Sequence, residues 1–220
     1  MCGRFSLKAS PDDLRKTLGT EPPAGYRPRY NIAPTQDVLS LVLDGGSRTA
    51  RMLRWGLIPF WAEDPRIGNR MINARAETVA QKPAFRNAFS RQRCLVVADG
   101  FYEWQASPAG KRPYRIQRPG AVPFCFAGLW ERWERGGKRI ESCTILTRAA
   151  DDRIAAIHDR MPVILDGSDY DRWLDAEADS AALHDMIATV PAFDLESYSV
   201  STLVNRPGND VPECLAPLVE

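Results

Sequence analysis

Short apolar runs, each ended by glycine, proline or polar residues, recur along the chain and constrain its fold more than any other feature. Runs of about four to eight residues of this kind are typical of β-strands. They cover Arg4–Leu7, Val38–Leu43, Thr49–Gly56, Cys94–Ala98, Tyr114–Gln117, Phe124–Trp130, Ser142–Thr147, Pro162–Leu165 and Leu195–Val200. Helical patterns do not alternate regularly with these strands. The sequence therefore predicts an α+β protein, a single domain with a curled, mostly antiparallel β-sheet core flanked by short helices.

The clearest helix signal lies near the start of the chain. Ser10 is a typical N-cap, Pro11 suits the first helical position, and Gly19 is suited to end the helix. Further helices are expected over Ala76–Gln81, Pro83–Arg91, Ala149–Ile157, Ser168–Glu177 and Ser180–Val190.

The sequence also predicts turns and loops. Gly45-Gly46 separates two strand-like runs and predicts a β-hairpin. Residues 20–36 and the segment Leu57–Met71 are expected to be irregular. Irregular segments of this length are often functional.

Length and composition limit the class of protein. The chain has 220 residues, enough to bury a core, and we expect one domain over residues 1–220. No apolar run reaches the ~18–20 residues that a membrane span requires. The first ten residues lack the apolar core of a signal peptide, which favours a cytoplasmic protein. We expect a monomer without membrane contact.

The cysteines do not indicate a metal site or a disulfide framework. They lie far apart, at positions 2, 94, 125, 143 and 214, and no C-x-x-C pair occurs. The chain has only two histidines, His158 and His184. We therefore expect no metal and no cofactor. Cys94, Cys125 and Cys143 lie in apolar runs and are expected to be core residues.

The net charge of +1 results from an excess of basic residues in one part of the chain and an excess of acidic residues in another. Residues 1–150 hold 25 Lys and Arg against 13 Asp and Glu, a net charge of +12, whereas residues 151–220 hold 4 against 15, a net charge of −11. This asymmetry indicates a polyanionic partner for the basic part. Arginine supplies 24 of the 29 basic residues, and its planar fork suits phosphate.

Cys2 directly follows Met1. If Met1 is removed, Cys2 carries a free α-amine beside its thiol, with pKa values near ~7.7–8.0 and ~8.5 in unperturbed groups. This 1,2-aminothiol condenses with an aldehyde: the amine forms an imine, and the thiol then closes a thiazolidine ring. The commoner alternative is an ordinary small residue near a terminus.

Two further residues could transfer protons. Glu103 follows an apolar strand and is flanked by Phe101, Tyr102 and Trp104. A carboxyl near apolar rings has a raised pKa, which suits proton transfer. His158 could act as an acid near neutral pH. The alternatives are a strand-end carboxylate that points to water and a loop histidine with a structural role.

Polar and aromatic residues suited to a nucleic acid lie in the same segments. Asn73 could bind a carbonyl or hemiacetal oxygen, or cap a helix. Arg75 and Arg160 each follow a candidate residue by two positions, so in an extended segment they share its face and could hold phosphate. The alternative for each is a surface ion pair. The tryptophans Trp55, Trp61 and Trp104 could stack on bases or pack in the core.

Taken together, these segments resemble the SOS-response-associated peptidase family, whose members process abasic sites in DNA. The resemblance covers most of the chain. It is carried, in order, by Met1–Phe5, Tyr30–Thr35, Arg54–Trp61, Asn73–Thr78, Arg93–Trp104 and His158–Pro162.

The resemblance implies a covalent sensor of abasic sites in single-stranded DNA. Cys2 would form a thiazolidine crosslink with the sugar aldehyde, and Glu103 would shuttle protons. His158 would protonate the sugar ring oxygen, and Asn73 would orient the sugar or the Cys2 backbone. It also implies a lyase side reaction, autocatalytic removal of Met1 and a nucleoid-associated state on DNA. The phosphate contacts would be Arg75 and Arg160, with Arg4 a weaker candidate.

Two other functions remain open on these residues. The first is an amide hydrolase with Cys2 as nucleophile, activated by His158 or by its own amine. A peptide substrate would not require a basic face. The second is a non-catalytic module that binds single-stranded DNA through its basic part and its tryptophans.

Overall fold

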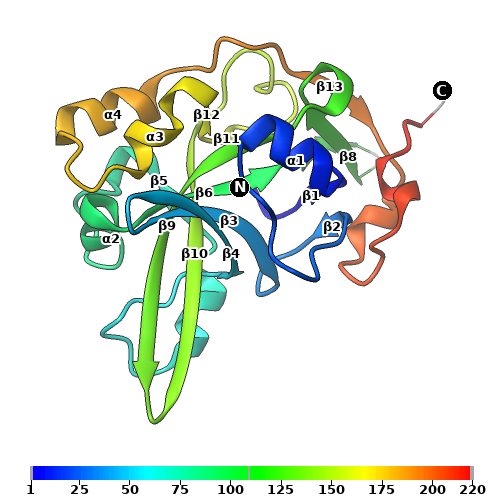
Figure 1. Ribbon diagram of the computed structural model, residues 1–220. Helices are drawn as coiled ribbons and strands as arrows, with labels where there is room; N and C mark the ends of the chain where they lie inside the picture. Colours follow the sequence, from blue (N-terminus) through cyan, green and yellow to red (C-terminus); the bar gives the residue numbers. More distant parts are fainter. Residues whose placement is uncertain (1, 109, 219–220) are drawn as a thin grey trace.

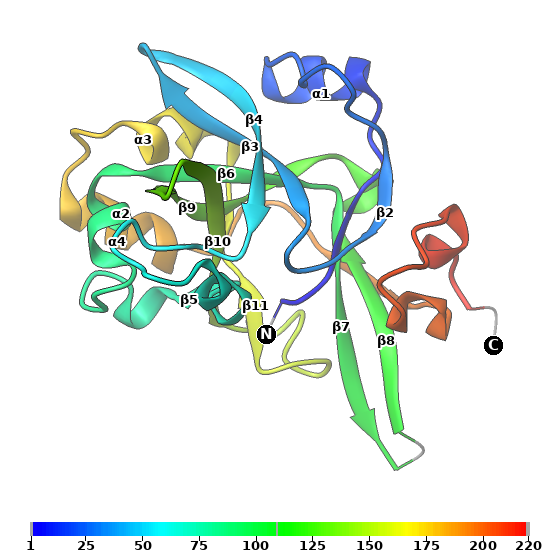
Figure 2. The same ribbon diagram turned by 90° about the horizontal axis from the view of Figure 1, so that it is seen from below.

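The computed structural model describes residues 2–108 and 110–218. Its smaller sheet has the strand order β13-β8-β7-β1-β2, and each neighbouring pair is antiparallel. Its strands are β1 (Phe5–Leu7), β2 (Arg29–Ile32), β7 (Gly100–Ser107), β8 (Gly110–Gln117) and β13 (Glu196–Ser199). The strands β7 and β8 continue as a projecting hairpin (Figure 2).

The larger sheet curls until it closes on itself. It has the order β11-β10-β4-β3-β6-β9-β12, and β9 also pairs with β10, so that β10, β4, β3, β6 and β9 form a small barrel. Its strands are β3 (Asp37–Asp44), β4 (Ser47–Trp55), β5 (Asn73–Arg75), β6 (Arg93–Ala98), β9 (Phe124–Arg135), β10 (Lys138–Ala149), β11 (Arg160–Pro162) and β12 (Ile164–Leu165). Only the pairings of β10 with β4 and with β5 are parallel among the described residues. The predicted α+β fold with a curled, mostly antiparallel sheet is confirmed.

Short helices cover the outside of this core. The α-helices are α1 (Pro11–Leu18), α2 (Arg86–Arg91), α3 (Tyr170–Leu174) and α4 (Ser180–Ala188). The 3₁₀ turns are η1 (Pro65–Arg70), η2 (Ala76–Thr78), η3 (Pro119–Ala121), η4 (Gly167–Asp169), η5 (Thr202–Asn205) and η6 (Pro212–Leu215). The helices α3 and α4 lie together on one side, and the arm formed by β9 and β10 projects away from the body (Figure 1). No helix in the described ranges is long and apolar enough to cross a membrane.

The first helix has the caps that the sequence predicts. Ser10 Oγ accepts a hydrogen bond from the Asp13 backbone, and the Asp13 carboxylate accepts one from the Ser10 backbone. This reciprocal pair satisfies N–H groups that the helix leaves unpaired. Gly19 ends the helix with φ of 64°, a left-handed conformation that glycine adopts without a steric penalty.

A buried ion pair fastens β1, which follows Cys2, to β8, the partner of the strand that carries Glu103. Asp99 Oδ1 accepts hydrogen bonds from Ser6 Oγ on β1 at 2.7 Å and from Arg115 Nη2 on β8 at 3.0 Å. Both charged side chains are at most 1% exposed. A charge at this depth requires such partners. The network therefore fixes β1 against the β7–β8 hairpin.

Aromatic rings join the small sheet to the barrel. The ring of Phe5 packs edge-on against Trp55, with centroids 5.1 Å apart, and against Phe126, at 5.7 Å. The three internal cysteines that we expect in the core are fully buried, as predicted: Cys94, Cys125 and Cys143. β1, which follows Cys2, is thus anchored in the main core.

Three local predictions are corrected. The segment Ala149–Ile157 is not a helix: Ala149 ends β10, and turns follow, because pairing with β11 extends the strand to that residue. β2 forms within the expected loop 20–36, because β1 pairs with it. Glu103 lies inside β7 instead of at the end of a strand.

Candidate functional site

Cys2 is fully buried and lies just before β1. Its thiol faces the carbonyl oxygen of Arg4 at 3.9 Å. Burial raises the pKa of the Cys2 thiol well above its usual value, and the nearby Glu103 carboxylate raises it further. The thiol is therefore held in its neutral form at pH 7.

Asn73 holds the main chain of Cys2. Its Nδ2 donates a hydrogen bond to the Cys2 carbonyl oxygen at 2.7 Å. Asn73 is the first residue of β5, which runs parallel to β10. In this pairing Asn73 lies opposite Ile145. In Figure 2 the segment that precedes β1 lies next to β5, in keeping with this hydrogen bond. Asn73 Oδ1 is buried and has no hydrogen-bond partner among the described residues, so it can accept one from a ligand.

Glu103 and His158 face each other. Glu103 is 2% exposed, and burial raises the pKa of its carboxyl to about 7. Its Oε2 lies 3.8 Å from His158 Nε2, longer than a hydrogen bond but close enough for a proton relay with small movement. Burial lowers the pKa of His158, which keeps the ring neutral at pH 7.

The backbone of Arg160 selects the tautomer of His158. Its N–H donates to His158 Nδ1 at 2.9 Å. A backbone N–H can only donate, so Nδ1 is an acceptor and Nε2 carries the proton. Asp159 Oδ1 also lies 2.9 Å from Nδ1, a contact that would favour the charged ring. That carboxylate is 87% exposed and can turn to water, whereas the Arg160 N–H belongs to β11, which pairs with β10. The Nε2–H group therefore faces Glu103.

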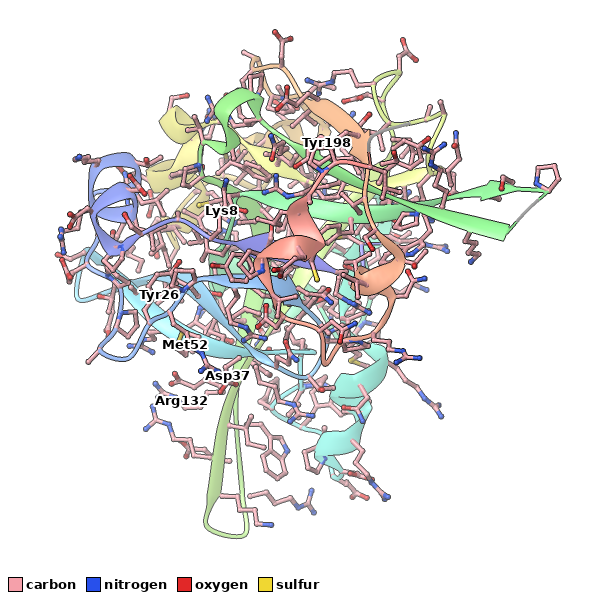
Figure 3. All side chains as sticks on the ribbon, turned by 90° about the vertical axis from the view of Figure 1, so that its right-hand side faces the viewer. Lys8, Tyr26, Asp37, Met52, Arg132 and Tyr198 are labelled. Carbon is pink, nitrogen blue, oxygen red and sulfur yellow. The ribbon has the colours of Figure 1, made fainter. Side chains whose placement is uncertain are left out.

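A groove of about 510 Å³ adjoins Asn73. Arg75 and Trp61 lie on its wall, and the full lining is Trp61, Asn73, Arg75, Thr78, Lys82, Pro83, Ala84 and Phe85. Arg75 is exposed, and the ring of Trp61 is half exposed. The groove thus offers basic groups and an exposed ring next to the residue that holds Cys2. A separate cavity of about 150 Å³ is lined in part by Tyr26 and Met52, labelled in Figure 3.

The other two predicted arginines bind protein groups. Arg160 forms a two-point ion pair with Glu77, with Nη1–Oε1 at 2.5 Å and Nη2–Oε2 at 3.0 Å. Arg4 donates to Asn31 Oδ1 at 2.8 Å and to the Val204 carbonyl at 2.6 Å. Both residues are less exposed than Arg75.

The predicted tryptophans fall into different environments. Trp55 is fully buried, and its Nε1 donates to the Ile72 carbonyl at 2.8 Å. No base can stack on this ring, so the expected stacking role of Trp55 is wrong. Trp104 is partly exposed, donates to Asn205 Oδ1 at 2.7 Å and lies under the Arg4 guanidinium, 5.9 Å from its carbon. Trp61 is the most accessible of the three.

Sequence reasoning missed Glu77 and Asn31. Glu77 lies in the same motif as Asn73 and Arg75, but nothing in the motif identifies Arg160 as its partner. Asn31 joins Arg4 to the C-terminal segment, since its Nδ2 donates to the carbonyls of Val204 and Asn209. Asn31 lies in the run Tyr30–Thr35 that contributes to the resemblance, but nothing in that run indicates its partners at the C-terminal end of the chain.

The site contains one thiol, one carboxyl, one imidazole and one side-chain amide. Within residues 2–108 and 110–218, no group of three or more His, Cys, Asp and Glu side chains is arranged to hold a metal ion. The arrangement can transfer protons, bind an oxygen and present a nucleophile, all at the junction of β1, β5, β7 and the segment before β11.

The chain is similar to proteins of known name over nearly its whole length. It is 42% identical over 221 residues to the abasic site processing protein YoqW of Bacillus subtilis (strain 168), covering 98% of this chain and 99% of that protein. It is 32% identical over 266 residues to the abasic site processing protein HMCES of Xenopus tropicalis, covering 100% of this chain and 79% of the relative.

Solved structures show the same fold. A protein of Bordetella bronchiseptica, 30% identical, superposes with a TM-score of 0.78 over 91% of this chain and 100% of its own. A protein of Bacteroides thetaiotaomicron, 24% identical, reaches 0.89 over 99% and 100% and shows the fold alone. The sequence model of the family "SOS response associated peptidase (SRAP)" matches residues 1–207. The chain therefore belongs to this family.

Proposed function

We propose that this protein processes abasic sites in single-stranded DNA by covalent capture. The observation that carries the proposal is the placement of Cys2, held by Asn73 beside the Glu103–His158 pair. The relatives named abasic site processing proteins point to the same substrate.

The reaction begins once Met1 has been removed and the α-amine of Cys2 is free. The amine nitrogen attacks the C1′ aldehyde of the opened sugar and gives a carbinolamine. Loss of water gives an imine, and the sulfur then adds to the imine carbon while the thiol proton passes to nitrogen. An aldehyde and an aminothiol thus become a thiazolidine and one water, with no redox change.

The electrostatics favour this order of attack. The thiol of Cys2 has a raised pKa and is poorly nucleophilic at pH 7, whereas an α-amine near ~7.7–8.0 is partly unprotonated. Glu103, with a pKa of about 7, is populated in both protonation states. It can therefore accept the proton that the amine loses, donate one to the departing water and assist reversal.

His158 promotes opening of the sugar. An abasic deoxyribose is mostly a closed hemiacetal, and its opening breaks the bond from C1′ to the ring oxygen while the proton of the C1′ hydroxyl passes to that oxygen, with no net gain of protons. The Nε2–H of His158 points toward Glu103 and hence toward the site of attack. It can hydrogen-bond the ring oxygen, and Asn73 Oδ1 can accept a bond from a sugar hydroxyl.

DNA binding relies on phosphate and on stacking, because an abasic site offers no base to read. Arg75 and Trp61 line the groove beside Asn73 and provide both contacts. Arg160 and Arg4 are secondary phosphate contacts, through N–H groups not used by Glu77 or Asn31. An abasic nucleotide is easily turned out of the strand, which lowers the cost of reaching a buried cysteine.

Two side activities follow from the same chemistry. An imine at C1′ acidifies the C2′ protons, so that β-elimination and strand cleavage compete with ring closure. Removal of Met1 by the protein itself would account for the peptidase in the family name. We expect the protein to act as a monomer.

Intact-mass spectrometry tests the proposal. After incubation with a single-stranded abasic oligonucleotide, a protein that lacks Met1 should gain the mass of the oligonucleotide minus one water. Cys2→Ala and Cys2→Ser should both abolish the stable adduct and retain only an imine that borohydride traps, because each variant keeps the α-amine and lacks the thiol. Cys214→Ala, which removes another buried cysteine, serves as the control and should react normally.

Other outcomes favour other functions. Turnover of a peptide without any DNA adduct would support an amide hydrolase. Reversible binding that Cys2→Ala leaves unchanged, again without an adduct, would support a non-catalytic DNA-binding module. Permanent capture of DNA by protein that keeps Met1 would rule out the proposed chemistry.

A further inference from the structure

The ion pair between Glu77 and Arg160 joins two segments of the candidate site. Glu77 follows β5, which carries Asn73, and Arg160 begins β11, which follows His158. Both terminal nitrogens of the Arg160 guanidinium, Nη1 and Nη2, donate to the Glu77 carboxylate oxygens, at 2.5 and 3.0 Å. Two-point pairs of this kind fix orientation as well as distance.

The pair crosses the strand that lies between these segments. β10 pairs with β5 through Thr147 and Arg75, and with β11 through Ala149 and Arg160. Arg160 Nη2 also donates to the Thr147 carbonyl at 2.6 Å. Glu77 accepts from the Ala149 backbone, and its hydrogen bonds with Arg160 are the main cause of its lowered pKa. The carboxylate thus contacts both β10 and β11.

The backbone of Arg160 extends this arrangement to the imidazole. Its N–H donates to His158 Nδ1 and leaves the proton on Nε2, which faces Glu103. Arg160 is only 18% exposed at its side chain, so its position depends on the partners that hold the guanidinium. Glu77 provides two of those contacts.

We propose that Glu77 is a positioning residue for the capture reaction: by holding Arg160 across β10, it keeps His158 in the Nε2–H tautomer and aimed at Glu103 and the sugar. This inference rests on the proposed function for its kinetic part. The tautomer of His158 depends only on the free protein.

A different role for the same pair makes the opposite prediction. If Glu77 simply occupied Arg160 until a phosphate displaced it, then removing its charge would free the guanidinium for DNA. Binding would tighten, and its salt dependence would steepen by about 0.7 in the log–log slope for one added phosphate contact.

The kinetic test uses Glu77→Gln, which keeps the shape of the side chain but loses the charge. The rate of crosslinking at saturating abasic DNA should fall about tenfold or more, since small misplacements of a reacting group are costly. The DNA concentration at half-maximal rate should change by less than about twofold, because no substrate contact is lost. In an Arg160→Gln background, the same change should have little further effect.

The spectroscopic test uses nitrogen NMR of the imidazole rings in the free protein. The chain has two histidines, and a His184→Gln variant assigns the signals. The wild type should show His158 with the proton on Nε2, and Glu77→Gln should show a mixture of tautomers. Glu141→Gln, which removes a carboxylate paired with Arg132 and Arg139 on the projecting arm, is the matched control and should change neither reading.

The outcomes of these two tests decide whether Glu77 has the positioning role. An unchanged tautomer and an unchanged maximal rate in Glu77→Gln would overturn the positioning role, as would tighter DNA binding with an undiminished rate. A loss of thermal stability alone, with both readings intact, would also overturn it. If the wild type forms no adduct, the proposed function fails, whereas the tautomer shift still decides what Glu77 does.

Discussion

Asn73 Nδ2 donates a hydrogen bond to the carbonyl oxygen of Cys2 at 2.7 Å, so a side chain from β5 holds the residue that precedes β1. The two residues are far apart in sequence: Asn73 belongs to the larger sheet, whereas Cys2 precedes β1 of the smaller sheet. The bond restricts rotation of the Cys2 backbone, which would otherwise move both reactive groups. The position of Cys2 is therefore set by the β5–β10 pairing as much as by β1.

Removing this hydrogen bond should slow capture. Asn73→Ala should lower the rate of crosslinking by about tenfold to a hundredfold, because the amine and thiol lose their orientation. Asn73→Asp should lose more, since a carboxylate would face the Cys2 carbonyl without a proton to share. Single-turnover gel assays measure both rates. Asn87→Ala, at an exposed asparagine of α2, is the control, and an equal loss there would contradict the role of Asn73.

The pH dependence of capture should report Glu103. Its pKa is raised to about 7, so the carboxylate that accepts protons appears as the pH rises through this value. The crosslinking rate should therefore rise between about pH 6 and pH 8. Glu103→Gln should be slow and should keep only the dependence due to the α-amine, near ~7.7–8.0. The rate–pH profiles of the two proteins test this, and a wild-type rate that is flat across pH 7 would exclude Glu103 as the base.

Much of the fold follows from local patterns, and the failures have physical causes. The capped helix after Ser10 and the hairpin at Gly45-Gly46 were predictable because their signals lie within a few residues. β2 has a weak pattern and is stabilised from outside: the Asp210 carboxylate accepts from the backbones of Tyr30 and Asn31. That partner lies far along the sequence and could not be foreseen.

The site shows the same division. Residue types and the family resemblance identify Cys2, Asn73, Glu103 and His158, but their convergence depends on strand pairings that no local pattern specifies. The solvent exposure of a side chain is likewise not specified by local sequence. Trp55 and Trp61 lie in one motif, yet the first ring is buried against Phe5 and the second is half exposed.

This contrast between the two tryptophans can be measured. Trp61→Ala should weaken binding of single-stranded DNA by about 1–3 kcal/mol, the usual contribution of one stacked base, and leave the protein stable. Trp55→Ala should instead lower the free energy of unfolding by about 3–5 kcal/mol, because it leaves a cavity in the core. Binding by fluorescence anisotropy and unfolding in urea separate the effects. Unimpaired binding by Trp61→Ala would remove that ring from the DNA interface.

Arg75 should contribute a phosphate contact. Arg75→Glu should weaken binding to single-stranded DNA and reduce the log–log salt slope by about 0.7 or more, because at least one fewer counterion is released. Titrations at several salt concentrations measure the slope. Arg135→Glu, at the end of β9 on the arm that projects away from the body (Figure 1), makes the same charge change and should leave the slope nearly unchanged. A slope that Arg75→Glu does not alter would exclude the contact.

The buried carboxyl of Glu103 should cost the protein stability at neutral and alkaline pH. Its pKa in the folded protein, about 7, exceeds the value of 4.5 for a free glutamate, so folding favours the protonated form. The contribution of this carboxyl to the free energy of unfolding is therefore greatest below about pH 4.5. It is lost as the pH rises from there through about 7. Glu103→Gln should raise the free energy of unfolding at pH 8 by up to about 3 kcal/mol and have little effect at pH 5.

Glu131 provides the comparison that separates stability from function. It is 3% exposed, and burial raises the pKa of its carboxyl to about 7 as well, but it lies on β9 beside the backbone of Phe60. Glu131→Gln should therefore gain stability at pH 8 in the same way, while DNA capture continues. Glu103→Gln should gain stability and lose capture. Urea unfolding at pH 5 and pH 8, with crosslinking assays on the same preparations, tests both. If Glu103→Gln is less stable than the wild type at pH 8, the carboxyl is held by favourable contacts in its charged form, and its proposed role as a proton shuttle with a pKa near 7 is wrong.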